Sequence, residues 1–228
     1  MGEVRDGLGG RREAALALVF CALACAAYLL YPLTNHGPNR IFLQTAWDRS
    51  LPVVPVMVIP YLSLFPLLAM AVLVALRGGW RNVQRYALAI AIAIAISCLV
   101  YTVAQSYVPR PAITGHGVLD QWVRDVYAND KPYDAFPSTH TSLATIIAVY
   151  CYRGMRRTGI VIGIWCLAII ASTVLIHQHY LADIAGGLVV AAISVYAADL
   201  LRPARGGRRL GLGPDAEGSV RGGTGGGT

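Results

Sequence analysis

The stretch "GIVIGIWCLAIIASTVLIHQHYLADIAGGLVVAAISVYAA", Gly159 to Ala198, holds two apolar runs separated by a short polar segment. Each run is close to the ~20 residues that an α-helix needs to cross a bilayer. The polar segment carries His179 and Asp183, four residues apart. A charge at membrane depth costs about 2.5–3.5 kcal/mol on insertion scales and is usually functional. The stretch therefore predicts two helices with a functional site at the start of the second.

The composition of the whole chain extends this interpretation. Of its 228 residues 56% are hydrophobic and only 14% are charged, whereas a soluble domain carries about 25% charged residues. The sequence therefore predicts a single-domain integral membrane protein. The net charge of +7 could suggest nucleic-acid binding, but the distribution of the arginines is explained by membrane topology, so no nucleic-acid partner is expected.

The apolar pattern predicts an all-α protein, a bundle of six transmembrane helices. The expected spans are 14–33, 53–76, 86–105, 139–153, 159–176 and 179–201. The fourth and fifth are short and closely linked, which indicates a helical hairpin. The alternating "AIAIAIAIS" at 89–97 lies within a span and is expected to be helical. Residues 1–13 are then an N-terminal cytoplasmic segment, 14–201 the catalytic membrane domain, and the Gly- and Arg-rich 202–228 a disordered cytoplasmic tail.

Lys and Arg fix the orientation of these spans. One side would hold fourteen of the nineteen basic residues and the other side five, namely Arg40, Arg49, Arg110, Arg124 and Lys131. The positive-inside rule makes the richer side cytoplasmic, with both termini there and the plasma membrane as the expected location. The long loop 106–138, expected to be helical around 118–128, then lies outside, as do the two ends that carry His140 and His179.

Two motifs supply the chemistry. In "DAFPSTHTSLA", Asp134 to Ala144, Pro and Ser precede an apolar run as they do at helix starts, so Ser138 would cap a helix that has His140 in its first turn. In the second motif, His179 and Asp183 would share one face of a helix, and the carboxylate would accept from one imidazole nitrogen. The other nitrogen would remain free to attack.

Both helices would begin at the outer membrane face and run inward. Their amino ends, with unpaired N–H groups and positive dipole ends, would converge into an anion site, phosphate above all. His179 could attack phosphorus, and His140 could protonate the leaving oxygen. Arg110 could bind the phosphoryl oxygens, and Ser138 could add a donor. This set suffices for phosphoryl transfer without metal or cofactor.

The motifs resemble those of the type 2 phosphatidic acid phosphatase superfamily. "PSTH" resembles its P-S-x-H motif, "STVLIHQHYLAD" (Ser172 to Asp183) its S-R-x-x-x-x-x-H-x-x-x-D motif, and Arg110-Pro111 the end of its K-x-x-x-x-x-x-R-P motif. The resemblance covers roughly residues 53–201. It implies a membrane lipid phosphatase or phosphotransferase in which His179 forms a phosphohistidine, with Asp183 as its partner and His140 as acid and base. It also implies phosphate binding by Arg110 and Ser138, and Thr139 and Thr173 within the motifs are further candidates.

Two positions depart from the family pattern. Val103 stands where the family has lysine, and Thr173 where it has arginine. The loss of two cations weakens the case for a dianionic phosphomonoester. The "ST…QHY…D…G" form is similar to the inositol phosphorylceramide synthase branch, which transfers a headgroup from a phosphodiester. The substrate is thus expected to be a phospholipid or isoprenoid phosphate, and a headgroup transferase of that branch is the alternative.

Other interpretations remain open from the sequence. His140, His179, Asp183 and a further histidine could ligate a metal, although the "PSTH" resemblance favours phosphate. The same fold could also serve a non-catalytic transporter or scaffold. His116 and His177 receive no role.

Overall fold

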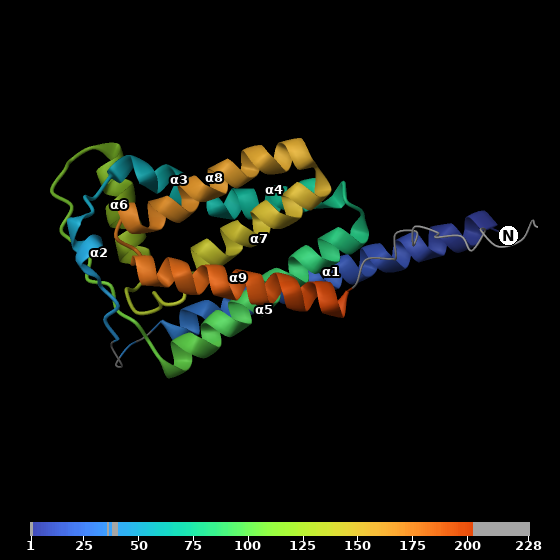
Figure 1. Cartoon of the computed structure of the whole chain (residues 1–228), viewed down its shortest axis with the longest axis horizontal. Helices are drawn as coiled ribbons and strands as arrows, with labels where there is room; N and C mark the ends of the chain where they lie inside the picture. The colour runs from blue at the N-terminus through green and yellow to red at the C-terminus, as the bar shows by residue number, and fades with distance from the viewer. Residues whose placement is uncertain (1, 36, 38–40, 203–228) are drawn as a thin grey trace, which may run out of the picture.

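The structure is a computed structural model that describes residues 2–35, 37 and 41–202, and over this part of the chain it is helical. The helices pack into an elongated bundle from which the N-terminal helix protrudes (Figure 1). They are α1 (Gly2–Thr34), α2 (Ala46–Ser50), the 3-10 helix η1 (Pro55–Met57), α3 (Val58–Leu62), α4 (Leu64–Leu76), α5 (Trp80–Val103), α6 (Val118–Asn129), α7 (Thr139–Gly154), α8 (Arg156–Leu175) and α9 (Leu181–Leu201). The predicted all-α class is confirmed, and "AIAIAIAIS" is helical within α5.

Five helical segments of the described chain are long and apolar enough to cross a membrane. They are Gly10–Thr34, Pro55–Leu76, Trp80–Val103, Arg156–Leu175 and Leu181–Leu201. The predicted fourth span is the helix α7, which has 16 residues. At 1.5 Å per residue it is about 24 Å long, short of a hydrocarbon core of ~30 Å. A helical membrane protein is therefore shown, and the count of six spans stays a prediction.

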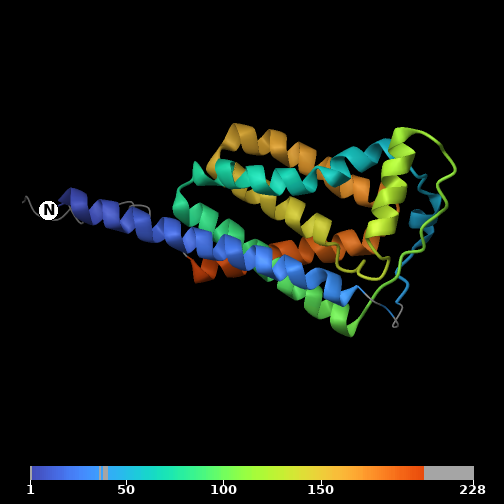
Figure 2. The ribbon, with the colours of Figure 1, turned by 180° about the vertical axis from the view of Figure 1, so that it is seen from behind.

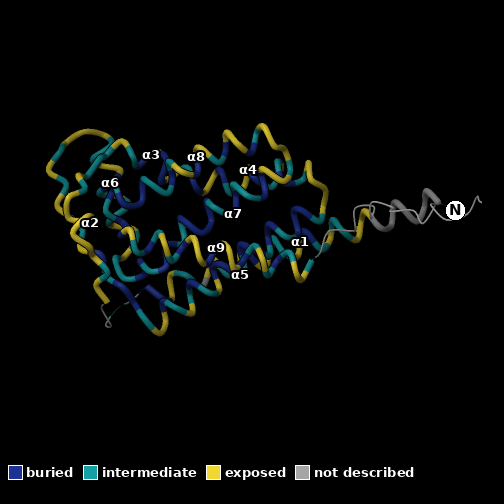
Figure 3. The backbone as a smooth tube through the Cα atoms, viewed as in Figure 1, coloured by how far each residue is buried: buried dark blue, intermediate teal, exposed yellow. Residues whose placement is uncertain are grey.

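Helix α7 forms the centre of the bundle. It packs against α4, α5, α8 and α9, and Figure 3 shows the buried interior that runs along it. Ile146, Ile147 and Tyr150 are fully buried, as are the polar Thr141 and Ser142 near its amino end. Because other helices surround α7, its first turns can be polar without exposing hydroxyl groups to lipid.

Both ends of the predicted membrane domain continue in helices. Helix α1 begins at Gly2 and runs along α5 (Figure 2), so the predicted N-terminal segment is continuous with the first span, and the predicted domain boundaries stay predictions. Within it, Glu13 forms an ion pair of 3.0 Å with Arg81 and accepts from Gln84 Nε2 at 2.7 Å. After α9, Arg202 Nε donates to Gln84 Oε1 at 2.9 Å. The rest of the predicted tail, 203–228, lies outside the described residues.

The two ends of the bundle differ in kind. The turns α4–α5 and α7–α8 and the end of α9 lie at one end, with Arg153 paired to Asp199 at 2.8 Å. At the other end α2 and α6 lie over the helix ends (Figure 1). The helix predicted at 118–128 is α6, and its Val123 is buried against Val58 and Ile176. This helix therefore packs on one end of the bundle through Val123.

Candidate active site

The first site motif forms the turn into α7. Ser138 is the N-cap, as the sequence predicts, and its Oγ accepts from Thr141 N at 3.2 Å. His140 is then the second residue of the helix. The preceding turn is held by Tyr101, whose hydroxyl donates to Pro137 O at 2.5 Å. These contacts fix the direction in which α7 leaves the turn and therefore the place of His140.

The second motif lies in the turn between α8 and α9. The sixth predicted span begins at 179, but α9 begins at Leu181, so His179 lies in the turn and not on the helix. The Gln178 and His179 amides both donate to Thr173 O, at 2.9 and 3.1 Å, which closes the turn tightly. His177 adopts a φ of 51°, a left-handed conformation that this tight reversal imposes.

Two glycines of α9 bring the motifs together. A Cβ on Gly187 would lie 2.6 Å from Ser138 O, and a Cβ on Gly186 would lie 2.5 Å from Phe136 Cε2. Both distances are below any van der Waals contact, so only glycine allows this approach. The Ser138 amide donates to Asp183 O at 3.0 Å across the same contact. The backbone of α9 therefore lies directly on the amino end of α7.

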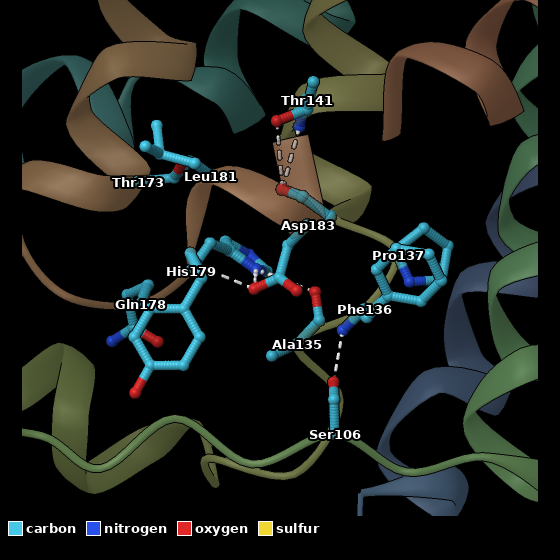
Figure 4. A network of polar contacts seen from close by, with 12 residues as sticks. Ser106, Ala135, Phe136, Pro137, Thr141, Thr173, Gln178, His179, Leu181 and Asp183 are labelled. Atoms are coloured by element: carbon cyan, nitrogen blue, oxygen red, sulfur yellow. Dashed lines mark hydrogen bonds and ion pairs between the residues drawn. The ribbon is translucent and has the colours of Figure 1, made fainter. Parts of the chain in front are cut away.

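This contact places the two catalytic candidates beside each other. The ring centroids of His140 and His179 are 6.2 Å apart. His179 Nδ1 lies 2.9 Å from Ala135 O and 3.6 Å from Asp183 Oδ2, and Figure 4 shows the imidazole beside this carboxylate. A carbonyl oxygen only accepts, so Nδ1 carries the proton and Nε2 is left with its lone pair. The predicted aspartate–imidazole hydrogen bond is thus replaced by one to a backbone carbonyl, with the carboxylate next to it.

His140 is held by ring contacts. Its imidazole stacks on Tyr61 with centroids 4.2 Å apart and an interplanar angle of 14°, and Phe65 packs edge-on at 6.1 Å. Its Nε2 is buried and has no hydrogen-bond partner among the described residues. A buried ring nitrogen without a partner is costly unless a ligand or water supplies one. His140 is therefore positioned by packing, with one nitrogen available.

The predicted anion site at two helix ends needs a correction. The Tyr180 amide, at the start of α9, donates to Asp183 Oδ2 at 2.7 Å, and the Leu181 amide donates to Asp48 Oδ1 at 2.8 Å. Two carboxylates therefore occupy the amino end of α9. At α7 only Thr141 N is taken by the cap, and the first-turn amides before it have no intrahelical partner. An anion would thus be bound by the amino end of α7 alone.

Three hydroxyl groups were predicted to bind phosphate. Ser138 is fully buried and its Oγ serves as the helix cap. Thr173 is also fully buried, and its hydroxyl donates to Ile170 O at 2.8 Å within α8. Thr139 lines a cavity beside His140. Of the three, only Thr139 faces a space that a ligand could enter.

Arg110 has a different main role from the predicted one. Its Nη1 donates to Tyr127 O at 2.8 Å and to Asp130 O, and its Nη2 donates to Gln178 Oε1 at 2.6 Å. The guanidinium thus caps the carboxyl end of α6 and ties it to the residue before His179. Burial lowers the pKa of Arg110. Two of its five N–H donors, including the buried Nε, are without a partner in the described chain, so a phosphate contact remains a prediction.

The cavity beside His140 has a volume of about 510 Å³. Tyr28, Leu62, Phe65 and Leu143 give it an apolar wall that continues toward the membrane-spanning part of α1 and α4. Its polar lining is Tyr31, Asn35, Tyr61, Asn129, Asp130, Lys131, Thr139 and His140. In the described residues, no group of three or more His, Cys, Asp or Glu side chains is arranged to hold a metal ion.

Sequence reasoning missed several members of the site. Asp48, the Ala135 carbonyl, Tyr61 and Lys131 come from segments without a motif, and only the fold brings them to the histidines. One signal was available, because Lys131 is the single lysine of the chain and lies six residues before the "PSTH" motif. The others act through a backbone carbonyl, through a cap that a distant segment supplies to α9, or through ring stacking, and none of these contacts has a sequence signature.

Asp134, at the start of the α7 turn, should make stability depend on pH. Burial raises the pKa of its carboxyl from 3.8 to about 6, against the hydrogen bond of 2.6 Å donated by Thr34 Oγ1. Stability from the protonated form is therefore complete below about pH 4 and lost as pH rises through about 6. Asp134→Asn is expected to unfold near the wild-type temperature at about pH 4 and several degrees higher above about pH 7, because at most about 3 kcal/mol of penalty is removed.

Thermal unfolding of the detergent-solubilised protein between these two pH values measures this difference. The exposed Asp125→Asn is the matched control and should follow the wild-type curve at each pH. If Asp134→Asn raised the unfolding temperature by the same amount at about pH 4 and above about pH 7, Asp134 would not be the group that titrates.

The fold and the site together define a class of protein: a helical membrane protein with two histidines at one end of its bundle. A scan against protein-family models matches the PAP2 superfamily over residues 82–206, which include Arg110, both histidine motifs and their helices. The chain belongs to the PAP2 superfamily, whose members are phosphatases and phosphotransferases, and it therefore belongs with the enzymes that act on phosphoric esters. A search of the curated proteins found no match.

Proposed function

We propose that the protein is an integral membrane lipid phosphatase or phosphotransferase that acts through a phosphohistidine at His179. The observation that supports this most directly is the pair of imidazoles 6.2 Å apart. The Ala135 carbonyl holds His179 Nδ1, which directs Nε2 to act as the nucleophile, and Asp183 beside it stabilises the positive charge that develops on the ring.

The reaction has two steps. The Nε2 lone pair of His179 forms a bond to phosphorus while the bond to the leaving oxygen breaks, and His140 gives that oxygen a proton. A bound phosphoryl anion favours the protonated form of His140, because opposite charges attract. Water or a hydroxyl group then attacks the phosphohistidine and returns a proton to His140. Water as acceptor makes the enzyme a phosphatase, and a lipid or alcohol acceptor makes it a transferase; no step needs a metal.

The substrate is a phospholipid or isoprenoid phosphate. This is supported by the apolar wall of Tyr28, Leu62, Phe65 and Leu143, which suits a hydrocarbon chain next to a polar headgroup. A headgroup transferase similar to the inositol phosphorylceramide synthase branch is favoured by one observation: Val103 at the end of α5 is 70% exposed and Thr173 is fully buried, so neither departure places a cation at the site.

The site is proposed to face the outside of the plasma membrane, with six spans and cytoplasmic termini. The arginine-rich turns at the bundle end opposite the histidines support this orientation through the positive-inside rule. Residues Asp130 and Asp134 lie at the histidine end, where basic side chains are fewer.

The test is incubation of the purified full-length protein with labelled lipid phosphates and phosphodiesters, with and without ceramide or diacylglycerol. Freed phosphate identifies a phosphatase, and label on the second lipid identifies a transferase. Turnover should survive EDTA, with metal analysis to exclude a tightly held ion. If neither freed phosphate nor a labelled second lipid were formed from any of the lipids, a non-catalytic transporter or scaffold would be the better assignment.

A further inference from the structure

The charged groups that face the cavity beside His140 are few. Among the described residues that line it, Lys131 and Asp130 are the two whose side chains carry a formal charge when His140 is neutral. They are neighbours in sequence, directly after α6 ends at Asn129. One cation and one carboxylate thus face the space in which a substrate would meet His140. The hydrogen-bond and ion-pair partners that each group has or lacks indicate which groups a substrate must present to them.

Lys131 presents an unpaired cation. Its side chain is exposed, and its amino group has no ion pair or hydrogen bond to any described residue. Its backbone is held in place instead, because Asn35 Nδ2 donates to Lys131 O at 2.9 Å. A lysine on an anchored backbone at the rim of a cavity can extend its ammonium group to an anion inside.

Only one carboxylate oxygen of Asp130, Oδ1, accepts hydrogen bonds from the described residues. Its Oδ1 accepts from Asn35 Nδ2 at 2.9 Å and from the Tyr31 hydroxyl at 3.2 Å, and Arg110 binds its backbone carbonyl. Its Oδ2 accepts no hydrogen bond within the described part of the chain. An ionised carboxylate can only accept, so this oxygen selects a donor, such as a hydroxyl group, and repels a further negative charge.

The charge balance decides between substrate classes. When a bound anion keeps His140 protonated, the described lining carries two positive charges, on Lys131 and His140, and one negative charge, on Asp130. The net charge of +1 matches a monoanionic phosphodiester better than a dianionic phosphomonoester. The positions of Val103 and Thr173 add no positive charge, because one side chain points out of the bundle and the other is buried within α8. A monoanionic phosphodiester that carries a hydroxyl group can satisfy Lys131 and Asp130 together.

We infer that Lys131 and Asp130 form a headgroup subsite, in which Lys131 binds the phosphodiester and Asp130 Oδ2 accepts from a hydroxyl group of the headgroup. The preferred substrate class is thus a phosphodiester lipid with a hydroxylated headgroup. This inference rests on the proposed function, since it assigns the substrate of the same site.

Turnover of three lipids with the same acyl chains tests the preference: phosphatidylglycerol, phosphatidylcholine and phosphatidic acid. Wild-type protein should turn over phosphatidylglycerol at least about tenfold faster, as kcat/KM, than the other two. Lys131→Gln should lower kcat/KM for phosphatidylglycerol about 10- to 100-fold, mainly through KM, and Lys131→Arg should restore part of it. Asp130→Asn keeps an acceptor for Asn35 and should remove the preference for glycerol over choline. Arg49→Gln and Asp125→Asn, exposed and outside the cavity lining, are the charge-matched controls.

A binding measurement separates this inference from the proposed function. Lys131 is the only lysine, so acetylation by an amine-directed ester, followed by mass spectrometry, reports on this one side chain with the terminal amine as internal reference. In His179→Ala protein, which would not consume lipid, phosphatidylglycerol should protect Lys131 and phosphatidylcholine should protect it less. Equal protection by both, or a wild-type preference for phosphatidic acid, would overturn the subsite and leave the proposed function standing. Protection without turnover of any lipid by the wild type would overturn the function and not the subsite.

Discussion

Replacing His179 by alanine is expected to lower lipid turnover by on the order of 10³-fold or more, because the nucleophile itself is removed. Among the described histidines near the site, His140 is stacked on Tyr61 and His177 Nε2 is engaged with Leu51 O at 3.2 Å, so neither is placed to replace it. The variant should fold, because the ring makes one side-chain hydrogen bond and lies in a turn held by backbone contacts to Thr173. Steady-state turnover of the labelled lipid measures the loss. Because the phosphorus–nitrogen bond of a phosphohistidine is broken by acid and survives in alkali, a rapid alkaline denaturing quench should find label on the wild-type protein only.

The control removes a histidine from the same end of the molecule. His116 is exposed in the long loop, so His116→Ala should keep wild-type turnover and labelling. A His179→Ala protein with comparable turnover to this control, or with retained covalent label, would show that His179 is not the nucleophile.

Gly187→Ala should have the largest effect among residues that never meet the substrate. Its Cβ would lie 2.6 Å from Ser138 O and 2.8 Å from Thr141 Cβ, so α9 must move away from the amino end of α7. Overpacking of this kind costs about 1–3 kcal/mol. The shift would also separate His179 from His140, and catalysis is sensitive to such displacements, so turnover should fall by about 10²-fold. Thermal unfolding in detergent and lipid turnover measure the two effects.

Gly163→Ala in α8 provides the matched control. Its Cβ would meet only Ala148 Cβ, at 4.0 Å, so stability should be unchanged or higher by at most about 1 kcal/mol, the helix propensity gained by alanine. Turnover should be that of the wild type. If both glycine variants behaved alike, close packing of α9 on α7 would not be what positions the histidines.

Part of the site could be predicted because its signals are local. Ser138 caps α7 as predicted, since a cap is formed by residues within one turn of each other. The placement of His140 at the start of that helix follows. The partner of His179 could not be predicted in the same way: spacing suggested Asp183, but the hydrogen bond goes to the carbonyl of Ala135, 44 residues earlier, and a backbone carbonyl has no sequence signature.

The groups that occupy the amino ends of α7 and α9 could not be predicted from the sequence either. Both helices do begin at one end of the bundle, but the amino end of α9 is occupied by Asp48, which belongs to α2, a short helix of a connecting segment. Arg110 is predicted from its motif as a phosphate ligand, but its guanidinium donates three hydrogen bonds to the end of α6 and to Gln178. Which groups are already satisfied depends on contacts between distant segments.

The sequence by itself determined that this is a helical membrane protein and where most of its helices lie. It also determined which two motifs carry the histidines. These features could be predicted because the length of an apolar run and the start of a helix depend on neighbouring residues. Only the tertiary structure decided that α9 rests on the backbone of α7 through Gly186 and Gly187, that a carbonyl orients His179, and that Lys131 and Asp130 face the cavity. Those features arise from packing between residues far apart in the chain, and the free energy of such contacts depends on positions that no local pattern contains.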